Sequence, residues 1–247
     1  MIKLMTHLVA GYPTLSDSEE YAITMAESGV NILEIQIPFS DPIADGPVIA
    51  EANIEALKNG ATTQKCFDMI GRLNDKLDTP IVIMTYFNVV FRFGMEKFCK
   101  LALASGVASL IIPDYPFDEE KGNGLIAMCA KYHLNFVPVV SPNIKQDRLK
   151  SVLQHGSGFV YCVARKGTTG SKTIIGKDTA DYLKRVRKLT KLPIGVGFGL
   201  SEKSQMNALE PYADIGIMGT ALIKQYQNKS LSQGIKSIKQ FLSTFNS

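Results

Sequence analysis

Eight short apolar runs alternate with amphipathic segments along the 247-residue chain, and this alternation limits the possible folds more than any other feature. Almost wholly apolar runs are typical of parallel strands that are buried on both faces. The runs expected to be strands are Thr6–Ala10, Asn31–Ile37, Ile81–Tyr86, Ser109–Ile112, Phe136–Val140, Gly158–Val163, Pro193–Gly197 and Asp214–Met218. The segments expected to be helices are Ser16–Ser28, Lys65–Leu77, Met95–Ala104, Glu119–Tyr132, Gln146–His155, Lys177–Leu189, Glu202–Leu209, Ala221–Gln225 and Ser230–Phe245.

Eight strand–helix units in a chain of this length predict an α/β fold, a closed (β/α)₈ TIM barrel with extra helices. No linker, repeat or low-complexity break interrupts the pattern, so we expect residues 1–247 to form a single TIM-barrel domain. An open, doubly wound sheet is the main alternative. Against it, the first strand–helix turn, Gly11-Tyr12-Pro13-Thr14, lacks the GxGxxG pattern of dinucleotide-binding sheets.

The composition excludes several classes of protein. Hydrophobic residues make up 45% of the chain, but no apolar stretch approaches the roughly 20 residues that span a bilayer. The N-terminus has no long apolar run and no small-residue cleavage site, so we expect neither a signal peptide nor a membrane partner. The net charge of +4 comes from scattered basic residues. The densest basic cluster, at 184–188, falls inside an expected amphipathic helix, so no nucleic-acid partner is expected.

The cysteines and histidines carry no sign of a metal or disulfide site. The four cysteines are widely spaced, and each lies in an apolar or helical stretch, which predicts buried free thiols and a reducing compartment. We therefore expect a cytoplasmic protein. The three histidines lack the spacing of metal ligands, so no metal site is expected.

The segment from Leu33 to Pro47 holds three carboxylates at the end of one strand. Glu34 lies near the end of an apolar strand, and Asp41 and Asp45 lie in the proline-rich loop that follows it. A carboxylate on a rigid strand that faces one on a loop can carry out acid–base chemistry. The structural alternatives are a hydrogen-bonded Glu34 in the barrel mouth, an Asp41 that caps the loop and an Asp45 that forms a turn before Gly46. Two further side chains have the same ambiguity: Tyr161 and Asp114 either face the mouth or serve only packing and loop structure.

Glycine-rich segments follow the last three expected strands, at 165–171, 195–201 and 216–220. Glycines let backbone N–H groups approach an anion closely, and a helix that begins at Thr220 would add its positive end. Phosphate sites in barrels are often built from the loops after strands seven and eight. Tight turns alone could explain any one of these segments, but the three together favour a phosphate site. In the first, Arg165 and Lys166 could be phosphate ligands or exposed charges on a lid.

The chain resembles the tryptophan synthase alpha subunit family over nearly its whole length. The most specific match is Leu33-Glu34 together with Pro38-Phe39-Ser40-Asp41-Pro42-Ile43-Ala44-Asp45-Gly46-Pro47. Supporting matches are Gly11-Tyr12-Pro13, Tyr86 with Asn88, Pro113-Asp114, Tyr161 with Arg165, and Gly197-Phe198-Gly199. The resemblance implies a (β/α)₈ barrel. It also implies that the protein is a lyase that cleaves indole-3-glycerol phosphate to indole and glyceraldehyde 3-phosphate in tryptophan biosynthesis.

The resemblance also implies roles for individual residues. Glu34 matches the general acid/base, Asp45 the carboxylate that handles the indole nitrogen, and Tyr161 a catalytic-pocket tyrosine. The implied phosphate-binding positions are Gly170, Gly199, Gly219 and Thr220. Asp41 and Pro42 match a loop that faces the beta subunit, the partner expected in an αββα heterotetramer. No cofactor is implied for this chain, and pyridoxal phosphate is expected only in the beta partner.

The chain departs from the family pattern at four places. Gln36 stands where glycine is usual, His7 where an apolar aromatic residue is common, and Thr220 where serine is frequent. The segment before the first expected strand is short, so the helix that often closes the barrel bottom is expected to be missing or truncated. These departures concern the pocket and the barrel bottom rather than the two carboxylates.

Two other functions remain open from the sequence. Another phosphate-binding barrel, such as an isomerase or an enzyme that forms indole-3-glycerol phosphate, is expected to carry a catalytic lysine at a strand end, and no expected strand ends in one. A non-catalytic subunit that only activates its beta partner is the other alternative. The presence of both Glu34 and Asp45 argues against it.

Overall fold

The computed structural model describes residues 2–119, 124–163, 176–197 and 199–246. Within these residues the chain forms nine parallel strands: β1 (Lys3–Val9), β2 (Ile32–Gln36), β3 (Ile81–Met84), β4 (Val107–Ile111), β5 (Asn135–Val137), β6 (Val139–Val140), β7 (Val160–Val163), β8 (Ile194–Gly197) and β9 (Ile215–Met218). They are hydrogen-bonded in the order β5-β4-β3-β2-β1-β9-β8-β7-β6.

The two end strands of this order close the barrel. β5 and β6 are halves of one extended segment, and Pro138 separates them because proline has no N–H to donate to a ladder. β5 pairs with β4 on one side and β6 with β7 on the other, so the eight expected strand positions form a ring. The predicted TIM barrel is therefore confirmed.

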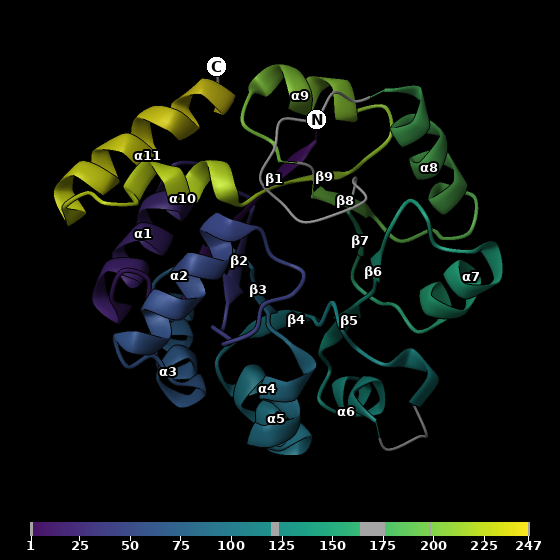
Figure 1. The fold of residues 1–247 in the computed structure, drawn as a ribbon, viewed down its shortest axis with the longest axis horizontal. Coiled ribbons are helices and arrows are strands. Elements are labelled where there is room, and N and C mark those ends of the chain that lie inside the picture. Colours follow the sequence, from purple (N-terminus) through teal and green to yellow (C-terminus); the bar gives the residue numbers. More distant parts are fainter. Residues whose placement is uncertain (1, 120–123, 164–175, 198, 247) are drawn as a thin grey trace.

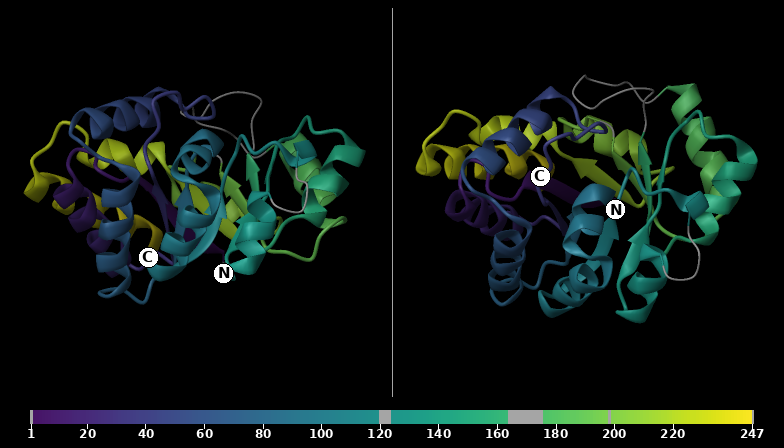
Figure 2. Two further views of the ribbon diagram at one scale, coloured as in Figure 1. Left: turned by 90° about the horizontal axis from the view of Figure 1, so that it is seen from below. Right: turned by 60° about the horizontal axis from the view of Figure 1, so that its bottom comes forward.

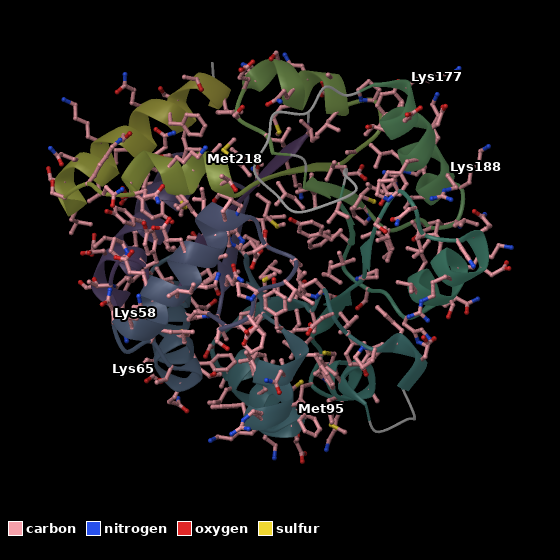
Figure 3. All side chains as sticks on the ribbon, in the orientation of Figure 1. Lys58, Lys65, Met95, Lys177, Lys188 and Met218 are labelled. Atoms are coloured by element: carbon pink, nitrogen blue, oxygen red, sulfur yellow. The ribbon has the colours of Figure 1, made fainter. Side chains whose placement is uncertain are left out.

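Helices surround the strands, as the views along and across the barrel show (Figures 1 and 2). Within the described residues they are α1 (Leu15–Glu27), α2 (Pro47–Lys58), α3 (Thr63–Asn74), α4 (Phe87–Phe93), α5 (Met95–Ala104), α6 (Leu125–Lys131), α7 (Gln146–Gln154), α8 (Lys177–Arg187), α9 (Lys203–Leu209), α10 (Thr220–Tyr226) and α11 (Leu231–Asn246), with a short 3₁₀ helix at Phe117–Glu119. None of these helices is long and apolar enough to cross a membrane. Labelled lysines such as Lys65 and Lys177 lie at the outer edge of the ring (Figure 3).

The helix predictions were right in most places and wrong in three. α2 and α4 were not predicted from the sequence. The helix expected over Glu119–Tyr132 is only α6, preceded by the 3₁₀ helix, with 120–123 outside the described residues. α2 begins with Pro47 in its first turn, a position where the fixed φ of proline favours a helix start. α4 is short and rich in aromatic and β-branched residues, and Asp114 Oδ1 stabilises its first turn by accepting the N–H of Phe87 at 2.8 Å.

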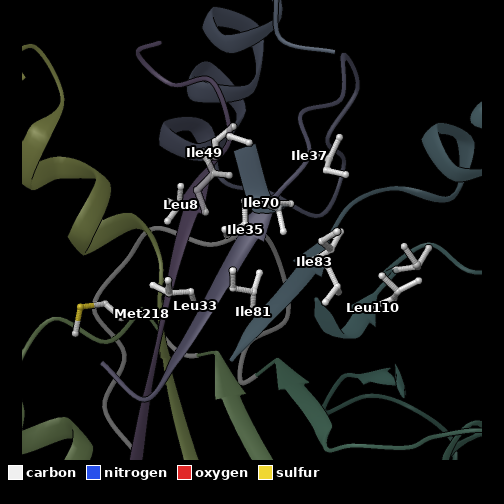
Figure 4. Packing of buried hydrophobic residues seen from close by; sticks show 14 of the residues in the cluster. Leu8, Leu33, Ile35, Ile37, Ile49, Ile70, Ile81, Ile83, Leu110 and Met218 are labelled. Atoms are coloured by element: carbon white, nitrogen blue, oxygen red, sulfur yellow. The ribbon is translucent and has the colours of Figure 1, made fainter. Parts of the chain in front are cut away.

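Two apolar layers hold the barrel together. Outward-facing strand residues such as Leu33, Ile35 and Ile83 pack against the helices in a large cluster (Figure 4). A smaller cluster fills the barrel interior, with members that include Met5, Val82, Ile111, Val137, Phe159 and Ile217. Because side chains alternate between the two faces of a strand, each strand feeds both layers.

This alternation sends the polar residues of β2 into the barrel. Leu33 and Ile35 belong to the outer layer and Ile32 contacts the inner one, so Glu34 and Gln36 share the inward face with Ile32. On β1, Met5 is in the inner cluster and His7 lies in phase with it. His7 is paired in register with Glu34 across the β1–β2 ladder. The chain thus places two ionisable side chains next to each other inside an otherwise apolar barrel.

Candidate active site

Glu34 and His7 form a buried pair at the carboxyl ends of β1 and β2. Their side chains are almost fully enclosed, since Glu34 is 2% exposed and His7 is 4% exposed. His7 Nδ1 lies 3.4 Å from Glu34 Oε1, the separation of an ion pair when the imidazole is protonated. Among the described residues, neither Glu34 Oε2 nor His7 Nε2 has a hydrogen-bond partner. Buried polar atoms without partners are rare in folded proteins, so these two are available to a ligand.

Asp45 enters the same site from the loop after β2. The fully buried Gln36 donates from Nε2 to Asp45 Oδ2 at 2.8 Å, and the Tyr86 hydroxyl donates to the same oxygen at 3.0 Å. The Tyr86 hydroxyl also accepts the N–H of Ala44 at 3.0 Å. The loop is further ordered by its own backbone turn, in which Asp45 N–H bonds to the carbonyl of Pro42 at 3.0 Å. One strand residue and one tyrosine therefore hold the loop carboxylate in the barrel mouth.

Burial and charge shift the protonation equilibria of these groups. For Asp45, burial is the largest effect and raises the pKa, while His7, Gln36 and Tyr86 lower it, and the net pKa lies above the usual 3.8. For His7, burial lowers the pKa, but the carboxylates of Glu34 and Asp45 outweigh it and the net pKa lies above 6.5.

Tyr161 on β7 forms one wall of the site beside a glycine of β8. A Cβ atom at Gly197 would lie only 2.6 Å from the Tyr161 hydroxyl oxygen, so the ring occupies the space that a side chain at this position would need. Burial, followed by the nearby charges of Glu34 and Asp45, raises the pKa of Tyr161 well above 10.0. The hydroxyl therefore stays protonated and keeps its ability to donate a hydrogen bond.

Three of the four predicted phosphate-binding positions are among the described residues, and these three lie on the rim of the same pocket. Gly199, Gly219 and Thr220 line it together with Glu34, Asp45 and Tyr161. Gly199 adopts a φ of +63°, a conformation that strongly favours glycine. Thr220 is the first residue of α10. Gly170, Arg165 and Lys166, and with them the expected lid, lie outside the described residues.

The remaining predicted residues lie at the surface of this end of the barrel. Asp41 is exposed and Pro42 is half-buried, and between them and Asp45 the large side chain of Ile43 is 76% exposed. Asp114 bonds to the first turn of α4, which supports its structural interpretation. Among the described residues, no three His, Cys, Asp or Glu side chains group as a metal site would require.

A larger cavity, of about 600 Å³, lies at the other end of the barrel, where Lys3, Ile32, Ser109, Phe159 and Ile215 line it. It holds none of the predicted site residues. Volume alone is a poor guide here, because the ionisable groups and the unpartnered buried atoms gather at the opposite end.

Three contributors to the site were named from the sequence but were given no role in it. Tyr86 and Gln36 hold Asp45, and His7 pairs with Glu34. Alternation along the strands was the available signal, since Gln36 lies two residues after Glu34 and Tyr86 two residues after the inward-facing Met84. Alternation predicts which residues face inward, but it does not predict which of those residues contact one another across different strands.

Comparison with known proteins identifies the family of this chain. The family model of the tryptophan synthase alpha chain matches residues 2–246. The tryptophan synthase alpha chain of Syntrophotalea carbinolica is 39% identical over 223 residues, which cover 90% of this chain and 87% of the relative. That of Desulforapulum autotrophicum is 37% identical over 241 residues, with 98% and 93% covered. A solved structure of the tryptophan synthase a2b2 complex of Pyrococcus furiosus has a chain of the same fold, with a TM-score of 0.91, 31% identity and coverage of 100% and 99%. The chain belongs to the tryptophan synthase alpha chain family.

Proposed function

We propose that this chain, as a tryptophan synthase alpha subunit, cleaves indole-3-glycerol phosphate to indole and glyceraldehyde 3-phosphate, with Glu34 as the acid/base group and Asp45 as the carboxylate that stabilises the charge on the indole nitrogen. The observation that carries the proposal is the convergence of two carboxylates from different segments on one buried pocket. Glu34 lies on a rigid strand and has one carboxylate oxygen without a partner among the described residues. Asp45 is held by hydrogen bonds from Gln36 and Tyr86.

The reaction breaks the bond between indole C3 and the carbon that carries the first side-chain hydroxyl. The Glu34 carboxylate takes the proton of that hydroxyl and delivers it to C3, which leaves a positive charge on the ring nitrogen and makes the ring an electron sink. When the bond breaks, its electrons return to the ring and the deprotonated hydroxyl becomes the aldehyde. One proton is taken and one is given, so Glu34 ends as the carboxylate that it was at the start.

Asp45 acts at the other end of the indole ring. Its carboxylate accepts a hydrogen bond from the ring N–H and stabilises the positive charge that develops there. Gln36 and Tyr86 both bond to Oδ2, so Oδ1 is the oxygen left to face the ring. Tyr161 forms the pocket wall, where its protonated hydroxyl can orient the substrate.

The phosphate is proposed to bind at the rim made by Gly199, Gly219 and Thr220, together with Gly170 by family resemblance. Glycine lets the backbone come close to an anion, and Thr220 supplies a hydroxyl beside the N–H groups that begin α10. The proposed steps use only the side chains and backbone of this chain. Pyridoxal phosphate is expected in the beta partner, and the cytoplasm is the expected location.

The proposed partner is a tryptophan synthase beta subunit in an αββα assembly, as in the a2b2 complex of Pyrococcus furiosus. Asp41 and Pro42 are the proposed contact residues. The exposed Ile43 beside them would add to a contact at this loop, because covering its side chain removes apolar surface from water.

The test measures indole release from indole-3-glycerol phosphate by the chain alone and with a beta subunit. The wild-type chain should release indole slowly alone and faster with the partner. Glu34→Gln and Asp45→Asn should each lower kcat by roughly 10²–10⁴-fold. Glu20→Gln, the same change at an exposed position on α1, is the matched control and should behave as wild type. A folded wild-type chain that releases no indole with or without the partner would overturn the proposal in favour of a non-catalytic subunit.

A further inference from the structure

The His7 side chain is placed to control the carboxyl group of Glu34. The two residues are register partners on adjacent parallel strands, and both side chains point into the barrel. Their contact joins His7 Nδ1 to Glu34 Oε1 at 3.4 Å, while Glu34 Oε2 has no partner among the described residues. The two oxygens of one carboxyl group are therefore in different environments.

We propose that His7 is a positioning residue for Glu34: its Nδ1–H holds Oε1, so that Oε2 is the single oxygen that exchanges a proton with the substrate. The inference rests on the proposed role of Glu34 as the acid/base group. A carboxyl group that is held at one oxygen has lost much of its torsional freedom, and the proton-carrying oxygen then stays directed at one place in the pocket.

The charged and titratable groups around His7 support this arrangement. Glu34 on β2 and Asp45 in the following loop are the acidic groups near it, and Tyr161 on β7, which lines the same pocket, stays neutral. Burial lowers the pKa of His7, but Glu34 first and Asp45 second outweigh it. The contact with Glu34 therefore keeps a proton on an imidazole that burial alone would leave neutral.

An apolar side chain at position 7 could fill a similar space but would offer no donor to Oε1. In this chain Gln36 makes an analogous contact with Asp45, so both carboxyl groups are held by side chains of the strands before substrate binds.

Two variants of similar size separate positioning from packing. His7→Asn keeps an N–H donor near the place of Nδ1, whereas His7→Leu fills the space without a donor. His7→Leu should lower kcat about 10–100-fold with little change in KM, because the acid/base group is misplaced after substrate has bound. His7→Asn should recover most of that loss. His155→Leu, a change outside the pocket, is the control and should leave kcat as it is. Equal kcat for His7→Leu and wild type, or equal losses in the Asn and Leu variants, would overturn the proposal.

Titration of the histidine ring signals by NMR tests the contact without turnover. The chain has three histidines, and the spectrum of His7→Asn identifies the signal of His7. In the wild-type chain the His7 signal should titrate above 6.5, and in Glu34→Gln its pKa should fall, because the largest charge that opposes burial is gone. The same titration in both proteins would overturn the contact. Absence of indole from the wild-type chain would instead overturn the proposed function, so the two failures are distinguishable.

Discussion

Burial of Asp45 in the barrel mouth has opposite effects on stability and on catalysis. Its carboxyl group has a pKa above the usual 3.8, chiefly because burial disfavours the charged form. The folded state then binds a proton more tightly than the unfolded state does, so its contribution to stability falls as pH rises from 3.8 through the folded pKa. At neutral pH the charge on Asp45 therefore lowers the stability of the fold, although the proposed chemistry requires that charge.

The variant Asp45→Asn should therefore be less active and more stable. Asparagine keeps an oxygen that can accept from Gln36 and Tyr86, but it carries no charge to bury. We expect a higher free energy of unfolding than wild type at neutral pH, with the difference shrinking as pH falls toward 3.8. Urea unfolding at several pH values measures this. A variant that is less stable than wild type at neutral pH would contradict the burial argument.

At the scale of elements, β7 and β8 fit together through one large and one small residue. The Tyr161 ring fills the space above Gly197, where a Cβ would meet its hydroxyl at 2.6 Å. Gly197→Ala should lower the free energy of unfolding by about 1–3 kcal/mol and reduce activity, since the ring must move. Adding Tyr161→Phe should relieve part of the stability loss, because the closest contact is to the hydroxyl.

Gly71→Ala is the matched control for Gly197→Ala, because it makes the same substitution at a position with room for a Cβ. Gly71 lies inside α3, where an added Cβ meets its nearest neighbour, Ser105 Oγ, at 3.9 Å. Alanine should raise stability there by roughly 0.5–1 kcal/mol, because glycine is a poor helix former. Thermal unfolding of the four proteins measures both effects, and a Gly197→Ala chain as stable as wild type would contradict the close contact.

An ion pair connects α1 and α3 on the outside of the barrel. Glu19 accepts from Arg72 at 3.0 and 2.7 Å and from Lys76 at 2.9 Å, and its side chain is only 11% exposed. Burial raises the pKa of Glu19, but the two cations outweigh it and the net pKa is below 4.5. The contribution to stability is therefore present above pH 4.5 and is lost as pH falls through the folded pKa.

Replacing one cation tests this pair. Arg72→Met should lower the free energy of unfolding by about 1–2 kcal/mol at neutral pH, and the loss should shrink in acid. Lys100→Met, which removes an exposed ion pair with Glu96, should have no measurable effect. Chemical denaturation at neutral and acid pH measures both. A loss that is equal at all pH values would contradict the electrostatic origin.

At the scale of the whole molecule, all four cysteines are buried free thiols, as the sequence predicted. Burial raises the pKa of Cys66 and Cys162 to about 12, so these thiols stay protonated and unreactive in mild alkali. Cys66 lies on α3 and Cys162 on β7, and both are buried, so their labelling by a thiol reagent should require unfolding of the chain. The labelling rate should rise with denaturant along the unfolding curve measured by circular dichroism. A labelling rate of either thiol that is the same without denaturant as in the unfolded chain would contradict this.

The sequence predicted the barrel because each unit carries its own local pattern. Apolar runs of strand length and amphipathic runs of helix length occur in order, and the eight expected positions hold the observed strands. The errors occurred where local patterns are weak or contradictory. α4, with Val89 and Val90 beside aromatic residues, lacks an amphipathic pattern, and its first turn is stabilised by Asp114 from after the next strand. α2 was missed although Pro47 marked its start.

For the active site, the sequence determined which residue types lie at the strand ends and which of them face inward. Glu34, Gln36 and His7 follow from alternation along β1 and β2, because side-chain direction along a strand depends only on neighbouring residues. The tertiary structure alone decided that His7 meets Glu34, that Tyr86 and Gln36 hold one oxygen of Asp45, and that Tyr161 fills the space at Gly197. These contacts depend on the register and stagger of strands far apart in the chain, which the packing of the whole barrel sets and no local pattern encodes.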